Sequence, residues 1–214
     1  MSVAAVVVAG GRGARFGGLK QFSLVAGESV AARSVRATRS VAEYVVLVLP
    51  EGHEAADEGA DIVVVGGETR ADSVRAGLDA LPACDVVIVH DAARPLASPR
   101  LFADVVAAIE QGADAAIPGV RVTDTVKRVV ARDGRSVVTA TVDRSDLVTV
   151  QTPQAFRRHV LERAHAAQDV ATDDAALVEA IGGTVVVVVG DPQNVKITIR
   201  DDLDRVASAL GLGQ

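Results

Sequence analysis

Aromatic side chains are scarce in this chain of 214 residues: they make up 2% of it, and tryptophan is absent. There is also only one cysteine, Cys84, which excludes an internal disulfide and a zinc site built from several cysteines. The core must therefore be aliphatic, and 40 valines are available to fill it. Because β-branched side chains favour strands, this composition predicts a protein rich in buried β-strands.

Long hydrophobic runs and an excess of positive charge are missing as well. The longest apolar run covers residues 3–9, far below the roughly 20 residues that a membrane-spanning helix needs, and it lacks the basic flank of a signal peptide. The net charge of −6 disfavours a general affinity for the backbone of DNA or RNA. We therefore expect a cytoplasmic protein that has neither nucleic acid nor a membrane as a partner.

Short valine-rich runs alternate along the chain with helical patterns, which predicts an α/β fold with a mostly parallel, Rossmann-like sheet flanked by helices. The length suits one large domain or two small ones. Since neither a linker nor a repeat divides the chain, we expect one domain over residues 1–214. The predicted strands cover residues 3–8, 44–49, 61–65, 85–89, 113–117 and 185–189.

The helices that separate these strands have recognisable ends. Proline is favoured at the first helical position, so Ser98-Pro99 and Thr152-Pro153 each predict a helix that begins there. The second of these helices would carry Phe156 on its buried face. A further helix is predicted after Thr172, and the C-terminal helix is predicted to end before Gly211.

One segment, residues 119–150, breaks the alternation. Its two runs, TVKRVVAR (125–132) and RSVVTATV (135–142), alternate apolar and polar residues and meet at Asp133-Gly134. An Asp-Gly pair in that setting is a strong hairpin signal, and a hairpin cannot belong to a parallel βαβ unit. We interpret the segment as an arm inserted into the α/β domain. Since an isolated hairpin is only marginally stable in water, we expect the arm to pack against a second copy of the chain.

A glycine-rich loop, AGGRGARFGGLKQF (9–22), directly follows the first predicted strand. Its backbone N–H groups and cations would bind phosphates at the edge of the sheet where α/β proteins hold ligands; a flexible turn is the alternative. The loop matches neither of two known phosphate-binding motifs. Phe16 stands where G-x-G-x-x-G requires its third glycine, and Leu19 separates Gly18 from Lys20, whereas the glycine and lysine of a P-loop are adjacent. Arg15 and Lys20 would project into the loop. Its candidate nucleotide-binding glycines are Gly10, Gly11 and Gly13.

A second candidate site is VHDAARP (89–95), at the end of the strand predicted at 85–89. An acidic residue just beyond a buried strand is well placed to hold Mg²⁺ beside a bound triphosphate, which indicates Asp91. The alternative makes Asp91 a helix cap or turn residue with Arg94 as its ion-pair partner. The neighbouring phosphate loop favours the metal site.

Glycines also follow a strand in GGETRADSV (66–74). Gly66-Gly67 would let the backbone approach a flat ligand such as a base, and Ser73 could exchange a hydrogen bond with it; an ordinary helix start is the alternative. Arg144 and Lys196 are further candidates, although a lone cation usually lies on a solvated surface. The sequence contains neither a metal cluster of His and Cys nor a Ser-His-Asp arrangement.

Taken in order, these motifs resemble those of the 2-C-methyl-D-erythritol 4-phosphate cytidylyltransferases of the non-mevalonate isoprenoid pathway. The matching segments are AGGRGARF with LKQF, GGETRADSV, VHDAARP, DTVKR, TVDRSDL, TPQAF, ATDDAALVE and NVKIT. Many nucleotidyltransferases share the glycine-rich loop, whereas HDAARP, TVDR and NVKIT together are much more specific to this family. One departure from the family pattern is the short stretch FGGL between Arg15 and Lys20.

The resemblance implies a nucleotidyltransferase domain that transfers CMP from CTP to 2-C-methyl-D-erythritol 4-phosphate and releases pyrophosphate. It implies that Arg15 and Lys20 stabilise charge on the reacting phosphate and that Asp91 holds the cofactor, Mg²⁺ or another divalent cation. In this family the arm reaches across a homodimer. The protein would therefore have CTP, methylerythritol phosphate and a second copy of itself as partners.

The remaining site residues follow from the same resemblance. Those that would surround the cytosine are Gly67, Glu68 and Ser73, while Arg94 would support the loop that carries Asp91. Those that would hold the methylerythritol phosphate are Thr125, Arg144 and Lys196. Because Thr125 and Arg144 lie on the arm, they would serve the active site of the partner chain.

Other functions remain open at this point. A transferase of the same fold could act on another polyol phosphate, such as ribitol 5-phosphate, and the glycine-rich loop does not separate the two. A non-catalytic module could bind CTP and signal through the dimer, although an intact Lys20 and Asp91 argue against it. A nicotinamide dehydrogenase is disfavoured because the G-x-G-x-x-G motif fails.

Overall fold

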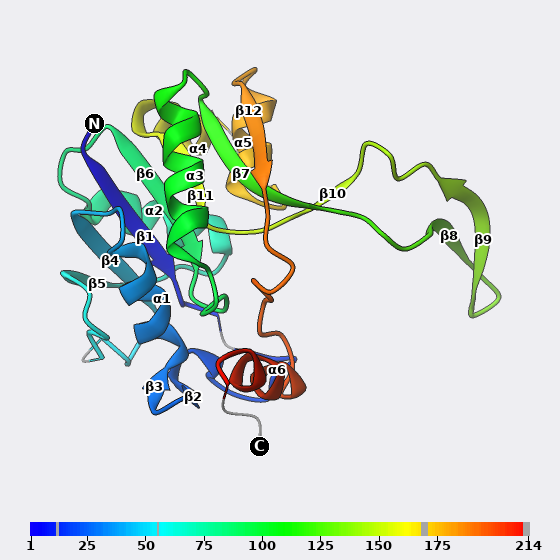
Figure 1. Cartoon of the computed structure of the whole chain (residues 1–214), viewed down its shortest axis with the longest axis horizontal. Coiled ribbons are helices and arrows are strands. Elements are labelled where there is room, and N and C mark those ends of the chain that lie inside the picture. The colour runs from blue at the N-terminus through cyan, green and yellow to red at the C-terminus, as the bar shows by residue number, and fades with distance from the viewer. Residues whose placement is uncertain (12, 55, 168–170, 212–214) are drawn as a thin grey trace.

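The computed structural model describes residues 1–11, 13–54, 56–167 and 171–211. A mixed sheet forms the centre of the molecule (Figure 1). Its strands are β1 (Val3–Val8), β4 (Tyr44–Leu49), β5 (Ile62–Val65), β6 (Val86–Asp91), β7 (Ala115–Arg121), β10 (Val148–Val150), β11 (Gln154–Arg157) and β12 (Val185–Val189).

The strand order along the sheet is β10-β7-β11-β6-β1-β4-β5, and β12 pairs with β7. The pairs β1–β4, β1–β6, β4–β5 and β7–β12 are parallel, whereas β10 and β11 run antiparallel to their neighbours. The mostly parallel α/β fold expected from the sequence is thus confirmed.

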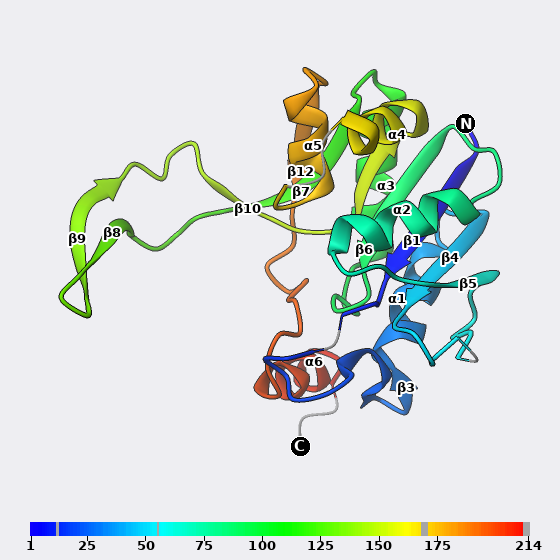
Figure 2. The ribbon, with the colours of Figure 1, turned by 180° about the vertical axis from the view of Figure 1, so that it is seen from behind.

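Helices cover both faces of the sheet, and within the described residues none is long and apolar enough to cross a membrane. They are α1 (Val30–Thr38), α2 (Arg70–Ala80), α3 (Pro99–Glu110), α4 (Arg158–Ala167), α5 (Asp174–Ala180) and α6 (Asp201–Ala209). Figure 1 shows α1 and α3 on one face, and Figure 2 shows α2, α4 and α5 on the other. Along β1, Ala5 and Val7 pack toward the first layer and Ala4 and Val6 toward the second. The valine-rich runs of β1, β4 and β6 are therefore buried on both sides, whereas Val187 and Val189 of the edge strand β12 are exposed.

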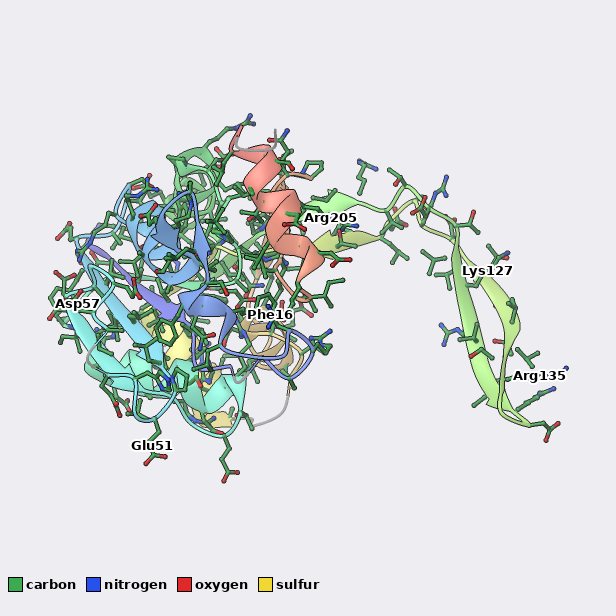
Figure 3. The ribbon with its side chains drawn as sticks, turned by 90° about the horizontal axis from the view of Figure 1, so that it is seen from below. Phe16, Glu51, Asp57, Lys127, Arg135 and Arg205 are labelled. Atoms are coloured by element: carbon green, nitrogen blue, oxygen red, sulfur yellow. The ribbon has the colours of Figure 1, made fainter. Side chains whose placement is uncertain are left out.

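A third, smaller apolar cluster lies at the carboxyl edge of the sheet. It includes Phe16 from the glycine-rich loop and Val206 from α6, together with Val25 and Ile197. The guanidinium of Arg200 lies 5.3 Å from the centre of the Phe16 ring, and Phe16 is labelled in Figure 3. A short hairpin, β2 (Leu24–Val25) and β3 (Glu28–Ser29), follows the loop. The cluster thereby anchors the loop to the C-terminal helix.

Most predicted helix ends are confirmed. Pro99 is the first residue of α3, and α6 ends at Ala209, before Gly211. At the start of α2, where a helix start was only the alternative interpretation, the Thr69 hydroxyl and the Asp72 carboxylate form a capping box. The helix predicted after Thr172 is α5, but its cap is Asp173, whose carboxylate accepts a hydrogen bond from the Ala176 N–H. Such local caps are readable from sequence because both partners lie within one turn.

The helix predicted to start at Thr152-Pro153 is wrong. The residues that follow form β11, which lies antiparallel between β6 and β7, and α4 begins only at Arg158. Phe156 is consequently a fully buried strand residue. The Thr152 hydroxyl does not cap a helix, because it accepts a hydrogen bond from the distant Asp91 N–H at 3.0 Å. Proline is also tolerated at the start of a strand, so the local signal was ambiguous.

Two predicted strands extend further toward the C-terminus in the structure than the sequence predicts. β6 continues to Asp91, which pairs with Val8 of β1, so Asp91 is the last residue of the strand rather than the first beyond it. The strand predicted at 113–117 is β7, displaced toward the C-terminus because β12 pairs with it as far as Gly119 and β10 as far as Arg121. Such pairing is non-local and does not show in the local pattern.

The arm contains the hairpin that the Asp-Gly pair predicts, formed by β8 (Val126–Arg132) and β9 (Arg135–Val142). Asp133 and Gly134 have φ angles of 49° and 72°, which suit a type I′ turn. The hairpin extends away from the sheet, with Arg135 near its tip (Figures 1 and 3). Residues 119–121 and 148–150 at the base of the arm belong to the main sheet. Exposed large apolar side chains on the hairpin are Val129, Val130, Val137 and Val138.

Candidate active site

Four segments meet at the carboxyl edge of the sheet and surround a cavity of about 180 Å³, which we call the loop pocket. They are the loop after β1, the segment between β5 and α2, the end of β6 and the segment between β12 and α6. This is the edge at which α/β sheets bind ligands. Its polar and glycine lining consists of Gly10, Gly11, Lys20, Gln21, Gly67, Glu68, Thr69, Arg70, Ser73, Asp91 and Lys196.

The glycine-rich loop is shaped by a turn at Gly13. This residue has a φ of 62°, and a Cβ placed there would lie 1.9 Å from the Gly18 carbonyl oxygen, so only glycine fits. The Gly13 carbonyl accepts hydrogen bonds from the N–H groups of Phe16 and Gly17, both at 2.9 Å. Gly10 and Gly11 line the loop pocket, whereas Gly13 and the exposed Arg15 do not. Arg15 is still close enough for its charge to lower the pKa of Lys20.

Lys20 lies half-buried where the loop meets the C-terminal segment. Its Nζ donates a hydrogen bond to the Ile197 carbonyl oxygen. Burial lowers the pKa of Lys20 below its ordinary value, and the positive charge of Lys196 lowers it further. Two cations, Lys20 and Lys196, are thus held near each other at the loop pocket, which is an arrangement that an anionic ligand would stabilise.

Asp91 lies between two cations. Its Oδ1 accepts a hydrogen bond from Arg70 Nε at 3.3 Å, and its Oδ2 forms an ion pair with Lys196. Burial alone would raise the pKa of Asp91, but the charges of Arg70 and Lys196 outweigh it and hold this pKa well below its usual range. The carboxylate is therefore ionised at neutral pH.

A buried polar network fixes the end of β6. The Thr152 hydroxyl contacts both the Asp91 N–H and His90 Nδ1, the latter at 3.2 Å. Asn194 Nδ2 donates to the Thr152 carbonyl oxygen at 2.9 Å, so the segment that carries Lys196 is attached to the same residue. The network explains why Asp91 and Lys196, which are 105 residues apart, meet with defined geometry.

The ring of His90 predicts a pH dependence of folding. It is fully buried, and this burial lowers its pKa from 6.5 to about 4. Between these values the unfolded chain binds a proton that the folded chain does not, so acidification should lower the free energy of unfolding by up to about 3 kcal/mol. Urea unfolding at pH 7 and pH 4.5 measures this loss. Removing the exposed histidine in His159→Gln should leave the loss unchanged, whereas a wild-type stability that is flat over this range would refute the assignment.

The residues expected around a base form one wall of the loop pocket. Gly67 and Glu68 line it, and a Cβ at Gly67 would lie 2.2 Å from Asp72 Cβ, so the close approach of α2 requires glycine. Ser73 is buried and donates from Oγ to the Thr69 carbonyl oxygen at 3.0 Å. A Cβ at Gly10 would lie 3.3 Å from the same Oγ. Glycine backbone therefore forms part of this wall, which would let a flat ligand approach closely.

A second cavity of about 440 Å³ adjoins the first, and we call it the lateral pocket. Arg70, Asp91 and Lys196 line both cavities and so mark their junction. Arg94 lines only the lateral pocket, where its Nη1 donates to the Asn194 carbonyl oxygen at 2.7 Å. The other polar residues of the lateral pocket are Gln151, Thr152, Gln154, Thr172, Asp173 and Glu179.

Thr125 and Arg144 lie on the arm, where both are exposed, and neither lines the loop pocket or the lateral pocket. Figure 1 shows that the arm projects sideways from the domain that contains the pockets. A single chain therefore does not bring these two residues to the other predicted site residues.

Arg70, which lines both pockets, was not singled out from the sequence, and neither were Asp174 and His165, to which it is linked. Arg70 binds both Asp91 and Asp174, and Asp174 in turn accepts a hydrogen bond from His165. Arg70 and Asp174 stand within the motifs GGETRADSV and ATDDAALVE, but they are 104 residues apart. An ion pair between residues so far apart in the chain leaves no signal in the local sequence pattern.

The fold and the site define a class: a single-domain α/β protein that places a glycine-rich loop, two lysines and a carboxylate around a pocket at the carboxyl edge of its sheet. A sequence model of the 2-C-methyl-D-erythritol 4-phosphate cytidylyltransferase family, IspD, matches residues 3–211. The chain therefore belongs to this family.

Individual relatives agree with this membership. A cytidylyltransferase of that name from Saccharopolyspora erythraea is 46% identical over 95% of this chain and 96% of its own length. The bifunctional enzyme IspD/IspF of Anaeromyxobacter sp. (strain Fw109-5) is 47% identical over 97% of this chain, which spans only 57% of that relative. The crystal structure of the cytidylyltransferase from Thermus thermophilus is 36% identical and superimposes with a TM-score of 0.81, covering 98% of each chain.

Proposed function

We propose that the protein transfers CMP from CTP to 2-C-methyl-D-erythritol 4-phosphate in isoprenoid precursor biosynthesis. An oxygen of the polyol phosphate would attack the α-phosphorus of CTP, a new P–O bond would form, and the bond to the β-phosphate would break to release pyrophosphate. The observation that carries the proposal is the junction of two pockets at Arg70, Asp91 and Lys196. It offers the nucleotide and the acceptor separate places that meet at one charged centre. Both substrates are charged phosphate esters that do not cross membranes unaided, so we place the reaction in the cytoplasm.

Cations supply most of the catalysis in this scheme. Two anionic phosphates repel each other, and the charge of the transition state spreads over the phosphoryl oxygens. Lys20 and Lys196 line the loop pocket and would bind these oxygens, while Arg15 would join them from the exposed side of the loop. The nucleophile is already an oxyanion near neutral pH, so no general base is needed.

Asp91 suits a magnesium ion that arrives with the nucleotide. Among the described residues no group of three or more His, Cys, Asp or Glu could hold a metal ion by itself. Mg²⁺ often binds through one or two carboxylates plus the phosphates of a substrate, and Asp91 supplies one ionised carboxylate at the pocket. When bound, the ion would neutralise phosphate charge and orient the triphosphate. Asp91 itself would exchange a cationic partner, Arg70 or Lys196, for the metal.

Substitution of Asp91 by asparagine tests this role. The amide keeps the shape of the carboxylate but loses its charge, so the magnesium concentration that gives half-maximal activity should rise by about tenfold or more. Activity is measured against magnesium concentration for wild type, Asp91→Asn and Asp104→Asn, whose carboxylate lies on the outer face of α3. The control should match wild type. If the magnesium concentration that gives half-maximal activity is unchanged in Asp91→Asn, then Asp91 has only a structural function.

We also propose that two copies of the chain associate through the arm. The hairpin exposes four valines to solvent, and a groove of about 690 Å³ at the base of the arm is lined by apolar residues that include Leu147, Val148, Val187 and Val189. A two-stranded hairpin is rarely stable in water without such packing. Association would also carry Thr125 and Arg144 to the pockets of the partner chain.

The direct test of the activity is product analysis. The purified chain is incubated with CTP, methylerythritol phosphate and MgCl₂, and the products are identified by mass spectrometry. The proposal requires a cytidine diphosphate ester of methylerythritol and an equimolar amount of pyrophosphate. Recovery of both substrates unchanged after incubation with the folded wild-type chain would refute it.

A further inference from the structure

A line of ion pairs leads from Asp91 into the interior of the domain. Arg70 Nε contacts Asp91 Oδ1 at 3.3 Å, and Arg70 Nη1 contacts Asp174 Oδ2 at 2.5 Å. The other oxygen of Asp174 accepts a hydrogen bond from His165 Nε2 at 3.0 Å. The line crosses four elements, since its members come from β6, α2, α5 and α4.

Asp174 is the most deeply buried member, with 1% of its surface exposed. Burial would raise the pKa of its carboxyl, but His165 and Arg70 outweigh this effect and keep the pKa below its usual value. A buried ion pair of this kind is a weak source of stability, because apolar side chains of similar volume often serve as well. Joining α5 to α2 therefore does not by itself account for a carboxylate at this position.

The location of Arg70 suggests what Asp174 does. Arg70 is the first residue of α2 and lines both the loop pocket and the lateral pocket. Its side chain is mostly buried, with 30% of the side-chain surface exposed. The bonds described above use Nε and Nη1, and within the described parts of the chain Nη2 makes no hydrogen bond. A donor that presents free N–H groups at the junction is suited to a phosphoryl oxygen.

Asp174 also competes with Asp91 for the same guanidinium. An arginine that faced Asp91 alone could pair with both of its oxygens, which is the preferred geometry for an Arg–carboxylate pair. In the structure Asp91 receives only Nε, while Asp174 takes Nη1 and His165 fixes the second oxygen of Asp174. Asp91 Oδ2 thereby stays available to Lys196.

We propose that Asp174, oriented by His165, is a positioning residue that holds the guanidinium of Arg70 at the junction of the two pockets, where Arg70 contacts the phosphates during transfer. The inference rests on the cytidylyl transfer proposed above. Its physical basis is preorganisation, since a charged donor that is already in place need not be ordered when the reaction occurs. Asp174 itself touches neither substrate.

Substituting Asp174 by asparagine keeps the volume of the side chain and removes the charge that holds Arg70. We expect kcat to fall by about 10- to 100-fold, because small displacements of a positioned group have effects of that size, while KM for CTP changes less than about threefold. Asp114→Asn is the matched control: this carboxylate accepts a hydrogen bond from the Thr184 N–H at 2.8 Å, away from both pockets. The control should keep the kcat of wild type.

A double-mutant cycle separates positioning from a structural function. In an Arg70→Lys background, adding Asp174→Asn should lower kcat less than about twofold further, since Asp174 acts only through Arg70. If the two losses multiply instead, or if Asp174→Asn lowers the melting temperature and leaves kcat unchanged, the inference is overturned.

A second substitution covers the case in which Asp174→Asn does not fold. His165→Leu removes the donor to Asp174 Oδ1 and keeps the Arg70 pair, so it should lower kcat by several-fold in the wild-type background and not in Arg70→Lys. An equal loss in both backgrounds would count against the inference. An inactive wild-type chain would refute the cytidylyl transfer itself, whereas an active wild type with an unimpaired Asp174→Asn would refute only the positioning of Arg70.

Discussion

Replacing Lys20 by alanine is expected to lower kcat by about 10²- to 10³-fold, the loss that follows removal of one preorganised donor to a charged transition state. Lys20 is half-buried beside Lys196, and its Nζ is held by the Ile197 carbonyl oxygen at the edge of the loop pocket. In the ligand-free protein these two cations repel each other. A triphosphate would relieve that repulsion, and the developing charge of the transition state would relieve it further.

The fold should survive this substitution, because the half-buried Lys20 side chain contributes a single hydrogen bond, to the Ile197 carbonyl oxygen. Rates are measured as pyrophosphate release at saturating CTP, with circular dichroism to check folding. Arg100→Ala, which removes a cation from the exposed face of α3, serves as the control and should match wild type. A folded Lys20→Ala variant with near-normal turnover would show that the glycine-rich loop does not supply the catalytic charge proposed for it.

Mixing two inactive variants is expected to restore activity if the arm is exchanged between chains. Arg144 lies on the arm and Lys20 in the domain, so a shared active site would combine Lys20 of one chain with Arg144 of the other. In a heterodimer of Lys20→Ala and Arg144→Ala, one site would carry both defects and the other would be intact. Up to half the wild-type activity should return for that species.

The control for this experiment uses two defects that lie in the same domain. Lys20 and Lys196 both line the loop pocket of one chain. In a heterodimer of Lys20→Ala and Lys196→Ala, each site keeps one defect and no recovery is expected. Activity is followed after the subunits have been allowed to exchange at several mixing ratios. Failure of Lys20→Ala and Arg144→Ala to complement at any ratio would contradict the shared site and leave the transferase activity standing.

Local sequence patterns predicted many of the strands and the hairpin of the arm. The valine-rich runs that became β1, β4 and β12 are buried or paired along their whole length, so hydrophobicity alone marked them. Asp133-Gly134 predicted the hairpin because two consecutive positive φ angles restrict the residues that a type I′ turn accepts. In both cases the information lies within a few neighbouring residues.

What the sequence could not predict is non-local. The residues of β11 were expected to form a helix, because Thr152-Pro153 can precede either a helix or a strand. Only the pairing of this segment with β6 and β7 makes it a strand. The same holds within the site. Lys20, Asp91 and Lys196 were identified from motifs, but the ion pairs that join Asp91 to Arg70 and Arg70 to Asp174 depend on how α2 and α5 pack.

The most direct test of the account is a substrate panel scored by pyrophosphate release. Each of the four nucleoside triphosphates is combined with methylerythritol phosphate, ribitol 5-phosphate and other polyol phosphates in the presence of magnesium. The account predicts that release is fastest for CTP with methylerythritol phosphate and depends on both substrates. Faster release with another pair, or release from CTP without an acceptor, would contradict it.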